Sequence, residues 1–175
     1  MFFGSSVTIP AVMFTEVKTM FPLWQAQRHR VGSLLVLLQF ALLLWLGLMA
    51  AAPLLQSRMT LLCGVFWGLS AVLGSWTLLH NRLGNFNVHP EPKTNGLLVT
   101  SGPYRLIRHP MYSTVLLLAA GLACVASLAL AWLVWVGLFG VLLAKALLEE
   151  RWLCECHPHY ASYCLRSKRF IPWLY

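Results

Sequence analysis

The stretch GPYRLIRHPMY, residues 102–112, leads directly into an apolar run that ends at the acidic pair Glu149 and Glu150. It places basic and aromatic side chains just before a segment long enough to enter a lipid bilayer. Charged side chains beside hydrocarbon cost several kcal/mol unless they find partners or water. Their position at both ends of a nearly charge-free run predicts a polar pocket at one face of a membrane, which we interpret as a cofactor site.

The composition of the chain supports a membrane setting. Hydrophobic residues make up 59% of the 175 residues and charged residues only 10%, whereas a soluble domain has about 25% charged residues. Each helix that crosses a hydrocarbon core of about 30 Å uses about 20 residues. The chain therefore has room for one membrane domain, residues 1–175, and none for a separate soluble catalytic domain.

Two uncharged runs predict the first two membrane spans within residues 31–81. Residues 31–52 are interrupted only by Gln39, and residues 59–79 contain no charge. The preceding residues 1–30 lack the basic start of a secretory signal. We expect an interfacial helix in that segment, with a short additional span as the alternative.

The apolar stretch 113–148 predicts a helical hairpin. It is broken only by Lys145, and at about 1.5 Å per residue it is too long for one crossing. The turn is expected near Ser127, with a third span over residues 111–125 and a fourth over residues 128–149. The expected fold is an all-helical integral membrane protein with about four spans, in which residues 82–175 form the part that binds cofactor and performs catalysis.

Basic residues predict the orientation in the membrane, because cytoplasmic flanks are enriched in lysine and arginine. Only Arg58 lies in the connection between the first two spans, and the hairpin turn has no charge. All other flanks are basic, which places the amino terminus, the long connection and the tail in the cytoplasm. We expect a bacterial inner-membrane protein whose active site faces the cytoplasm and whose net charge of +8 attracts anionic lipid headgroups.

The sequence argues against a metal site and against a nucleic-acid partner. Cys154, Cys156, His157 and His159 crowd into six residues, whereas zinc ligands come as two separated pairs. The basic residues are divided among three membrane flanks instead of forming one stripe, and no nucleic-acid-binding module is recognisable. The expected partners are membrane lipids and a lipophilic substrate.

Five motifs follow one another between residue 80 and residue 175: NGLLVTSGPYR at 95–105, RHPMYS at 108–113, the acidic pair at 149–150, YxxYxxR at 160–166 and IP at 171–172. This ordered set resembles the isoprenylcysteine carboxyl methyltransferase family. The resemblance implies a membrane methyltransferase that uses S-adenosyl-L-methionine, with the cofactor enclosed between the last helices and the carboxy-terminal segment. Phospholipid N-methyltransferases and sterol reductases share related carboxy-terminal patterns.

The charged groups of this cofactor require opposite charges on the protein. Glu149 or Glu150 is the candidate for the ammonium group, and because neighbouring helical residues point about 100° apart, we expect one of them to face the ligand and favour Glu150. Carboxylates at the carboxy end of a helix oppose its dipole, which favours a functional role. Arg105 and Arg108 are candidates for the cofactor carboxylate or for pairing with Glu149.

The resemblance assigns Tyr104, His109, Pro110 and Tyr112 to the cofactor pocket as well. Tyrosine rings attract cations such as the adenosyl sulfonium, and Pro110 sets the start of the next helix. The alternative role for the tyrosines is anchoring at the membrane interface.

Tyr160, Tyr163 and Arg166 are spaced three residues apart and are expected to line one side of a short substrate-binding helix. Arg166 matches the family's arginine that positions the methyl acceptor. A carboxylate acceptor, as in prenylcysteine-type substrates, is favoured and needs positioning more than a base. An amine acceptor would require a base such as His109 or a glutamate. Arg166, Glu150 and His109 form the expected catalytic set.

Three other functions are compatible with the sequence. One is a phospholipid or amine N-methyltransferase, and another is an NADPH-dependent reductase of related architecture, for which the chain is short. The third is a non-catalytic membrane subunit or small transporter, which would place ionisable residues at mid-membrane.

Overall fold

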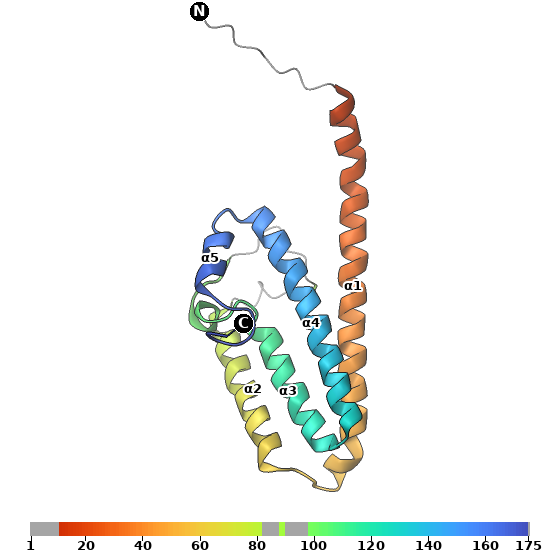
Figure 1. Ribbon diagram of the computed structural model, residues 1–175, viewed down its shortest axis with the longest axis vertical. Helices are drawn as coiled ribbons and strands as arrows, with labels where there is room; N and C mark the ends of the chain where they lie inside the picture. Colours follow the sequence, from red (N-terminus) through yellow and green to blue (C-terminus); the bar gives the residue numbers. More distant parts are fainter. Residues whose placement is uncertain (1–10, 82–87, 90–97, 175) are drawn as a thin grey trace, which may run out of the picture.

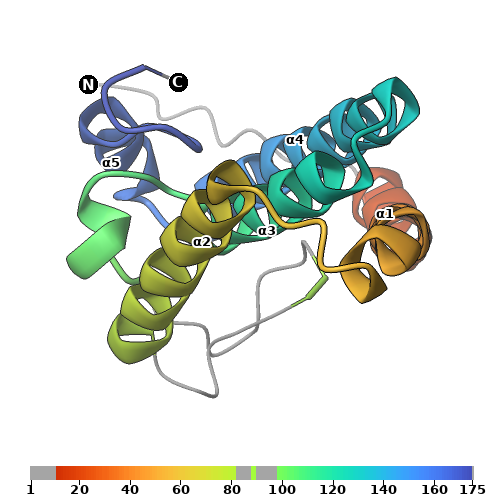
Figure 2. The same ribbon diagram turned by 90° about the horizontal axis from the view of Figure 1, so that it is seen from below.

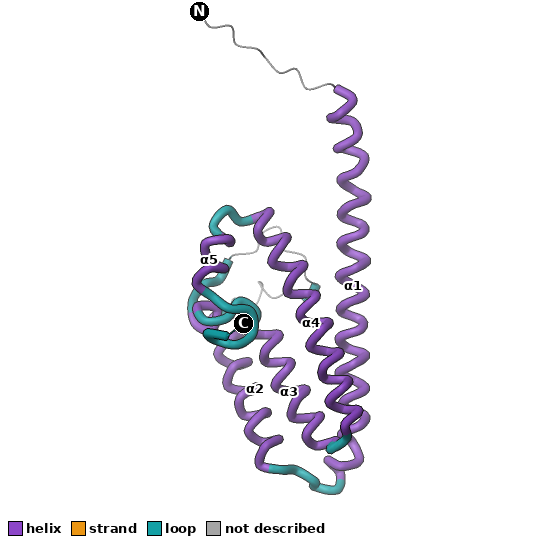
Figure 3. The backbone as a smooth tube through the Cα atoms, in the orientation of Figure 1, coloured by secondary structure: helices purple, strands orange, loops and turns teal. Residues whose placement is uncertain are grey.

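The computed structural model describes residues 11–81, 88–89 and 98–174, and side chains within these ranges from residue 28 onward. The regular elements of this described part are helices, which confirms the expected all-helical class (Figure 3). In chain order they are α1 (Ala11–Leu55), α2 (Leu61–His80), the short 3-10 helix η2 (Gly102–Arg105), α3 (Pro110–Ala126), α4 (Ala129–Cys156) and α5 (Tyr160–Arg166). In Figure 1, α2, α3 and α4 lie side by side and α1 runs along α4.

Three of these helices contain segments long and apolar enough to cross a membrane: Arg28–Leu55, Leu61–His80 and Ala129–Cys156. Most of their residues are not buried inside the protein, so their apolar side chains are available to lipid. Together they indicate an integral membrane protein. The fourth expected span, α3, has 17 residues and rises about 26 Å, so its crossing of the membrane stays a prediction.

The hairpin between α3 and α4 is confirmed at the expected turn. Ser127 adopts a left-handed conformation with φ 53° and its N–H donates to the carbonyl of Ala123 at 3.2 Å, which ends α3. A left-handed residue after the last helical turn is a common way to satisfy a terminal carbonyl. α4 then continues to Cys156, two turns beyond the predicted end at residue 149.

The expectation of a separate interfacial helix before residue 31 was wrong in one respect. α1 runs without a break from Ala11 to Leu55, and Pro22 lies within it. Residues 23–30 contain neither glycine nor proline and include good helix formers such as leucine, alanine and glutamine, so the helix propagates into the membrane span.

The core lies where α1, α3 and α4 meet. Its fully buried side chains pair large leucines with small alanines, which lets the helices approach closely, as is typical in lipid; they are Leu46, Ala119, Ala123, Ala131, Leu138 and Leu142. On the other side of α3, Ser70 of α2 donates a hydrogen bond to the carbonyl of Thr114 at 2.9 Å. These contacts hold α3 at the centre of the bundle.

The carboxy-terminal segment returns to the start of α3. Ile107 and Lys168 form an isolated parallel β-bridge. The N–H of Arg108 donates to the carbonyl of Lys168 at 2.7 Å, and the N–H of His109 donates to that of Arg169 at 3.1 Å. Figure 2 shows α5 and the following segment beside the loop that leads into α3. The polar motif at residues 102–112 and the tail therefore share one end of the bundle.

Candidate active site

Glu150, near the carboxy end of α4, is the centre of a charged cluster. Its Oε1 accepts a hydrogen bond from Nε of Arg108 at 2.7 Å and lies 3.2 Å from Nε2 of His109. Nε of Arg169 donates to both oxygens of Glu150, at 3.2 and 3.1 Å. Three donors from two different segments thus converge on one carboxylate, whose side chain is only 11% exposed. Charge-assisted hydrogen bonds of this kind are about twice as strong as neutral ones.

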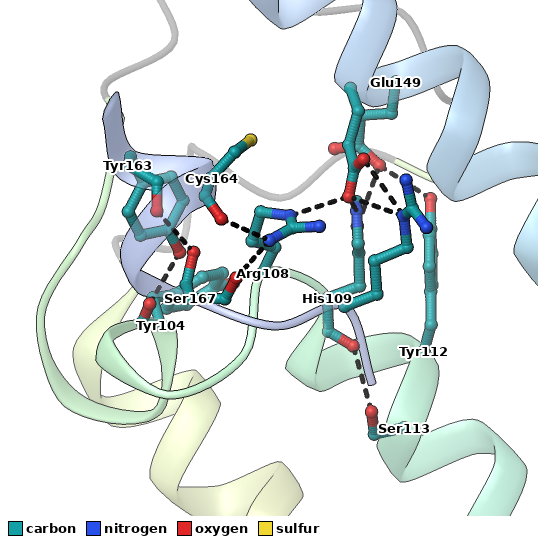
Figure 4. Close-up of polar contacts among 11 residues, drawn as sticks. Tyr104, Arg108, His109, Tyr112, Ser113, Glu149, Tyr163, Cys164 and Ser167 are labelled. Carbon is teal, nitrogen blue, oxygen red and sulfur yellow. Dashed lines mark hydrogen bonds and ion pairs between the residues drawn. The ribbon is translucent and has the colours of Figure 1, made fainter. Parts of the chain in front are cut away.

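Glu149 lies on the other side of His109. Its Oε2 accepts a hydrogen bond from the hydroxyl of Tyr112 at 3.0 Å and is 3.6 Å from Nδ1 of His109. The imidazole therefore lies between the two acids, with one ring nitrogen towards each (Figure 4). The side chain of Glu149 is 31% exposed, almost three times the exposed fraction of Glu150. Of the two acids, Glu149 is the more accessible.

The local backbone explains why these side chains meet. His109 is the N-cap of α3, and Pro110 fixes the first helical position, where its missing N–H would be unpaired in any case. The residues before it are held by the backbone hydrogen bonds to the tail. The acids come from the last two turns of a helix packed against α3, so the cluster forms where three segments of the chain meet.

Arg108 also joins the cluster to α5. Its Nη1 donates to the carbonyl of Cys164 at 3.2 Å and to the carbonyl of Ser167. Both carbonyls belong to the carboxy end of α5, where a helix dipole favours a positive charge. One guanidinium therefore fixes the acid on α4 and ends the short helix of the tail.

A buried lysine extends the polar network towards α1. Nζ of Lys145 donates to Oε1 of Gln39 at 2.6 Å and to the carbonyl of Val88 at 3.0 Å. It also lies 5.1 Å from the ring centre of Tyr112, which stacks in parallel on His109 at 5.2 Å. Gln39 and Lys145 are the sole interruptions of two apolar runs in the sequence, and an ionisable residue inside a span is a functional candidate. Sequence reasoning noted both residues and assigned neither to the site.

The remaining tyrosines pack in the wall beside the cluster. The hydroxyl of Tyr163 donates to the carbonyl of Tyr104 at 2.6 Å, and the hydroxyl of Tyr104 accepts from the side-chain amide of Asn81 at 3.2 Å. Burial raises the pKa of Tyr104 and of Tyr163 to about 12, and it raises the pKa of Tyr160 further. All three phenols are neutral at physiological pH, so they act through packing and hydrogen bonding and not as bases.

The structure brings together most of the predicted cofactor residues: Arg108, His109, Pro110, Tyr112, Glu149 and Glu150. It does not bring Arg105 or Arg166 to them. Both side chains are exposed, on η2 and at the end of α5, and within the described part of the chain neither makes an ion pair. The arginine of the tail that reaches the acids is Arg169, which the sequence did not single out as a site residue.

Comparison with known proteins links this cluster to a family. The sequence profile of the phospholipid methyltransferase family matches residues 59–159, which contain α2, α3, α4 and both acids. The cobalt-zinc-cadmium resistance protein CzcN of Cupriavidus metallidurans is 38% identical over 84 residues, which are 47% of this chain and 38% of CzcN. The chain therefore matches well under half of the length of this relative.

Proposed function

The chain belongs to the phospholipid methyltransferase family, as its motifs predicted, and on that premise we propose that it transfers a methyl group from S-adenosyl-L-methionine to a lipophilic acceptor. The family is one of methyltransferases, and the apolar helices indicate that this member acts in a membrane. The observation that carries the proposal is the cluster in which His109 lies between Glu149 and Glu150.

The exposed fractions of the two acids favour Glu149 for the ammonium group of the cofactor. Glu150 is enclosed by two arginines and a histidine. Glu149 accepts one hydrogen bond from Tyr112, and a carboxylate has about four lone-pair positions. We therefore assign the ammonium to Glu149, in place of the Glu150 that the sequence favoured, and give Glu150 the role of holding the arginines.

The two arginines of the cluster suit the cofactor carboxylate. Arg108 and Arg169 both contact Glu150 and so lie close together at this end of the bundle. A carboxylate next to paired arginines is bound by charge-assisted hydrogen bonds. The donor set therefore fits both ionic ends of the amino-acid part of S-adenosyl-L-methionine.

The aromatic residues have a positioning role. The ring of Tyr112 already contacts His109 and Lys145, so its hydroxyl, which orients Glu149, is its contribution to the site. His109 lies between the two acids and fixes their separation. In this arrangement the protein supplies position and electrostatic fit, which are the largest contributions to many transfer reactions.

The cofactor, when bound, supplies an electrophilic methyl group: the acceptor lone pair forms the new bond as the carbon–sulfur bond breaks, and that bond's electrons stay on sulfur. A carboxylate acceptor, the class favoured by the sequence, has no proton to lose. An amine acceptor must release one, and His109 with its two flanking carboxylates is the group that would take it. The family description favours this second candidate, phospholipid amine methylation.

We further propose that α3 completes a four-span bundle whose active site faces the cytoplasm of a bacterial cell. The connections α1–α2 and α3–α4 lie at one end of the bundle, and η2 and α5 lie at the other (Figure 1). The first end carries only Arg58, whereas the second carries Arg105, Arg108, Arg166, Lys168 and Arg169. This asymmetry is the one expected for a cytoplasmic site.

Calorimetric titration of the detergent-solubilised protein tests the proposed cofactor. S-adenosylhomocysteine is expected to bind, and NADPH is expected to give no heat of binding. Binding of NADPH alone would support a reductase, and binding of neither ligand would favour a non-catalytic membrane subunit. Incubation with radiolabelled cofactor and a panel of lipid carboxylates and lipid amines then identifies the acceptor class.

A further inference from the structure

An apolar cavity of about 310 Å³ adjoins the charged cluster. It lies among α2, α3, α4 and the tail, and its wall is almost entirely hydrocarbon and aromatic; Leu73, Trp76, Leu116, Trp135, Phe139 and Phe170 are among the residues that line it. Ligand sites typically join an apolar pocket of this size to a few placed polar groups. One of the lining residues, Phe170, also contacts His109 of the proposed active site.

Phe170 lies between the two compartments, which are the apolar cavity and the charged cluster. Its ring lines the cavity, lies 5.8 Å from the ring of Phe139 on the cavity side, and lies 6.0 Å from the ring of His109 on the cluster side. The side chain is buried. The residue before it, Arg169, reaches Glu150, so two consecutive residues of the tail serve the two compartments.

The backbone holds Phe170 in this position. Its carbonyl accepts a hydrogen bond from Oγ of Ser113 at 2.8 Å, and the carbonyl of Arg169 accepts from the N–H of His109 at 3.1 Å. Ser113 itself lines the cavity. Because these hydrogen bonds fix the tail against the first turn of α3, the ring of Phe170 is a fixed wall and not a loose side chain.

We propose that the cavity holds the apolar arm of the methyl acceptor, that the methyl-accepting group lies on the side of His109, and that Phe170, at the boundary between the cavity and the charged cluster, is the specificity-determining residue because its ring takes up space that the arm would otherwise fill. This inference rests on the proposed methyl transfer, and it assigns Phe170 a positioning role without contact to the reacting atoms. The occupant is a single hydrocarbon arm, because the cavity lies between helices and its lining offers almost no polar surface.

The cavity volume sets the expected length of the arm. An engineered protein cavity of about 150 Å³ holds one benzene molecule, so about 310 Å³ holds roughly twelve carbon atoms. Replacing Phe170 changes this capacity by the number of side-chain heavy atoms gained or lost. The capacity is therefore expected at about nine carbons for Phe170→Trp, about fifteen for Phe170→Leu and about eighteen for Phe170→Ala.

The test measures binding of saturated n-alkyl carboxylates of increasing length by native mass spectrometry of the detergent-released protein. In the unsubstituted protein, affinity is expected to rise about fourfold per methylene and to level off near twelve carbons. The chain length at which affinity stops rising should increase in the order Trp, Phe, Leu, Ala at position 170. Phe40→Ala, at an exposed position of α1, is the matched control and should leave it unchanged.

Titration with S-adenosylhomocysteine on the same preparations separates the two proposals. Unchanged cofactor binding with a shifted levelling point supports the role of Phe170, because a merely structural role would not move the chain-length limit in order of size. If cofactor binding is unchanged but the chain-length limit is the same for all four side chains at position 170, or is absent in all of them, this inference is overturned and the proposed function stands. If the unsubstituted protein does not bind S-adenosylhomocysteine, both the proposed methyl transfer and the role of Phe170 are overturned.

Discussion

Replacing each of the two neighbouring acids by glutamine is expected to separate ligand binding from stability: Glu149→Gln should weaken ligand binding, and Glu150→Gln should lower the free energy of unfolding. Glu149→Gln removes the more exposed charge and keeps an oxygen that can accept from Tyr112. A hydrogen bond to a charged group contributes about 1.5–3 kcal/mol, so the dissociation constant for S-adenosylhomocysteine should rise about 10- to 100-fold. The free energy of unfolding should change by less than about 1 kcal/mol, as for other exposed charges.

Glu150→Gln removes the counter-charge of two arginines, one of them nearly buried. Breaking such a pair typically costs about 3–5 kcal/mol, because the remaining charge stays buried without its partner. For a chain of this size, about 3 kcal/mol corresponds to a fall of roughly 6–12 °C in the midpoint of thermal unfolding. Tryptophan fluorescence during heating measures the midpoint.

Glu155→Gln is the matched control, because Glu155 forms an exposed ion pair with Arg28 at 2.9 Å. It should alter neither the midpoint nor the affinity appreciably. A Glu150→Gln protein that unfolds at the same temperature as the unsubstituted protein would refute the structural role of this acid. Ligand affinity that survives Glu149→Gln unchanged would refute the assignment of the ammonium.

Three further predictions concern the surroundings of the site. Gly102→Ala is expected to lower the free energy of unfolding by about 2–3 kcal/mol, since Gly102 has φ +59° and an added Cβ would overlap the ring of His80. Chemical denaturation measures this free energy, and an unchanged value would contradict the geometry. Lys145→Met should lower the free energy of unfolding by about 1–3 kcal/mol, because it leaves buried oxygens without their donor. A double-mutant cycle with Gln39→Leu should show a coupling energy above about 0.5 kcal/mol between the two side chains, and additive effects would exclude their interaction. The neutral form of Tyr104 is favoured by folding, with a pKa raised to about 12, so its stabilisation should be complete below pH 10 and lost as the pH rises towards 12. Tyr104→Phe should reduce the pH dependence of the free energy of unfolding over this interval, and the remainder is expected from Tyr160 and Tyr163, whose pKa values are raised as well.

Sequence patterns predicted the features that depend on local order. A 36-residue apolar run with a serine near its middle defines a hairpin, and the left-handed Ser127 forms its turn. The motif at residues 108–112 and the acids at the end of the run were expected to meet, and they do. These are consequences of helix length, which fixes where the ends of α3 and α4 lie.

Features that depend on long-range pairing were outside the reach of the sequence. The rotation between neighbouring helical residues predicts that Glu149 and Glu150 face different directions, but the packing of α4 decides which one is enclosed. The β-bridge of Lys168 fixes the register of the tail, and this register brings Arg169 to the acids and leaves Arg166 in solvent. Likewise, Lys145 and Gln39 are 106 positions apart and meet only because α1 lies along α4.

The return of residues 167–170 to the start of α3 has a consequence for biogenesis. Apolar helices enter a bilayer and associate as separate units before finer contacts form. Three backbone hydrogen bonds and two guanidinium groups, those of Arg108 and Arg169, then dock the tail onto the bundle. A nascent chain whose helices α1 to α4 have entered the bilayer, while residues 167–170 are still in the ribosome, would thus have the membrane bundle without the proposed site, so we expect completion of the site to follow insertion of these helices.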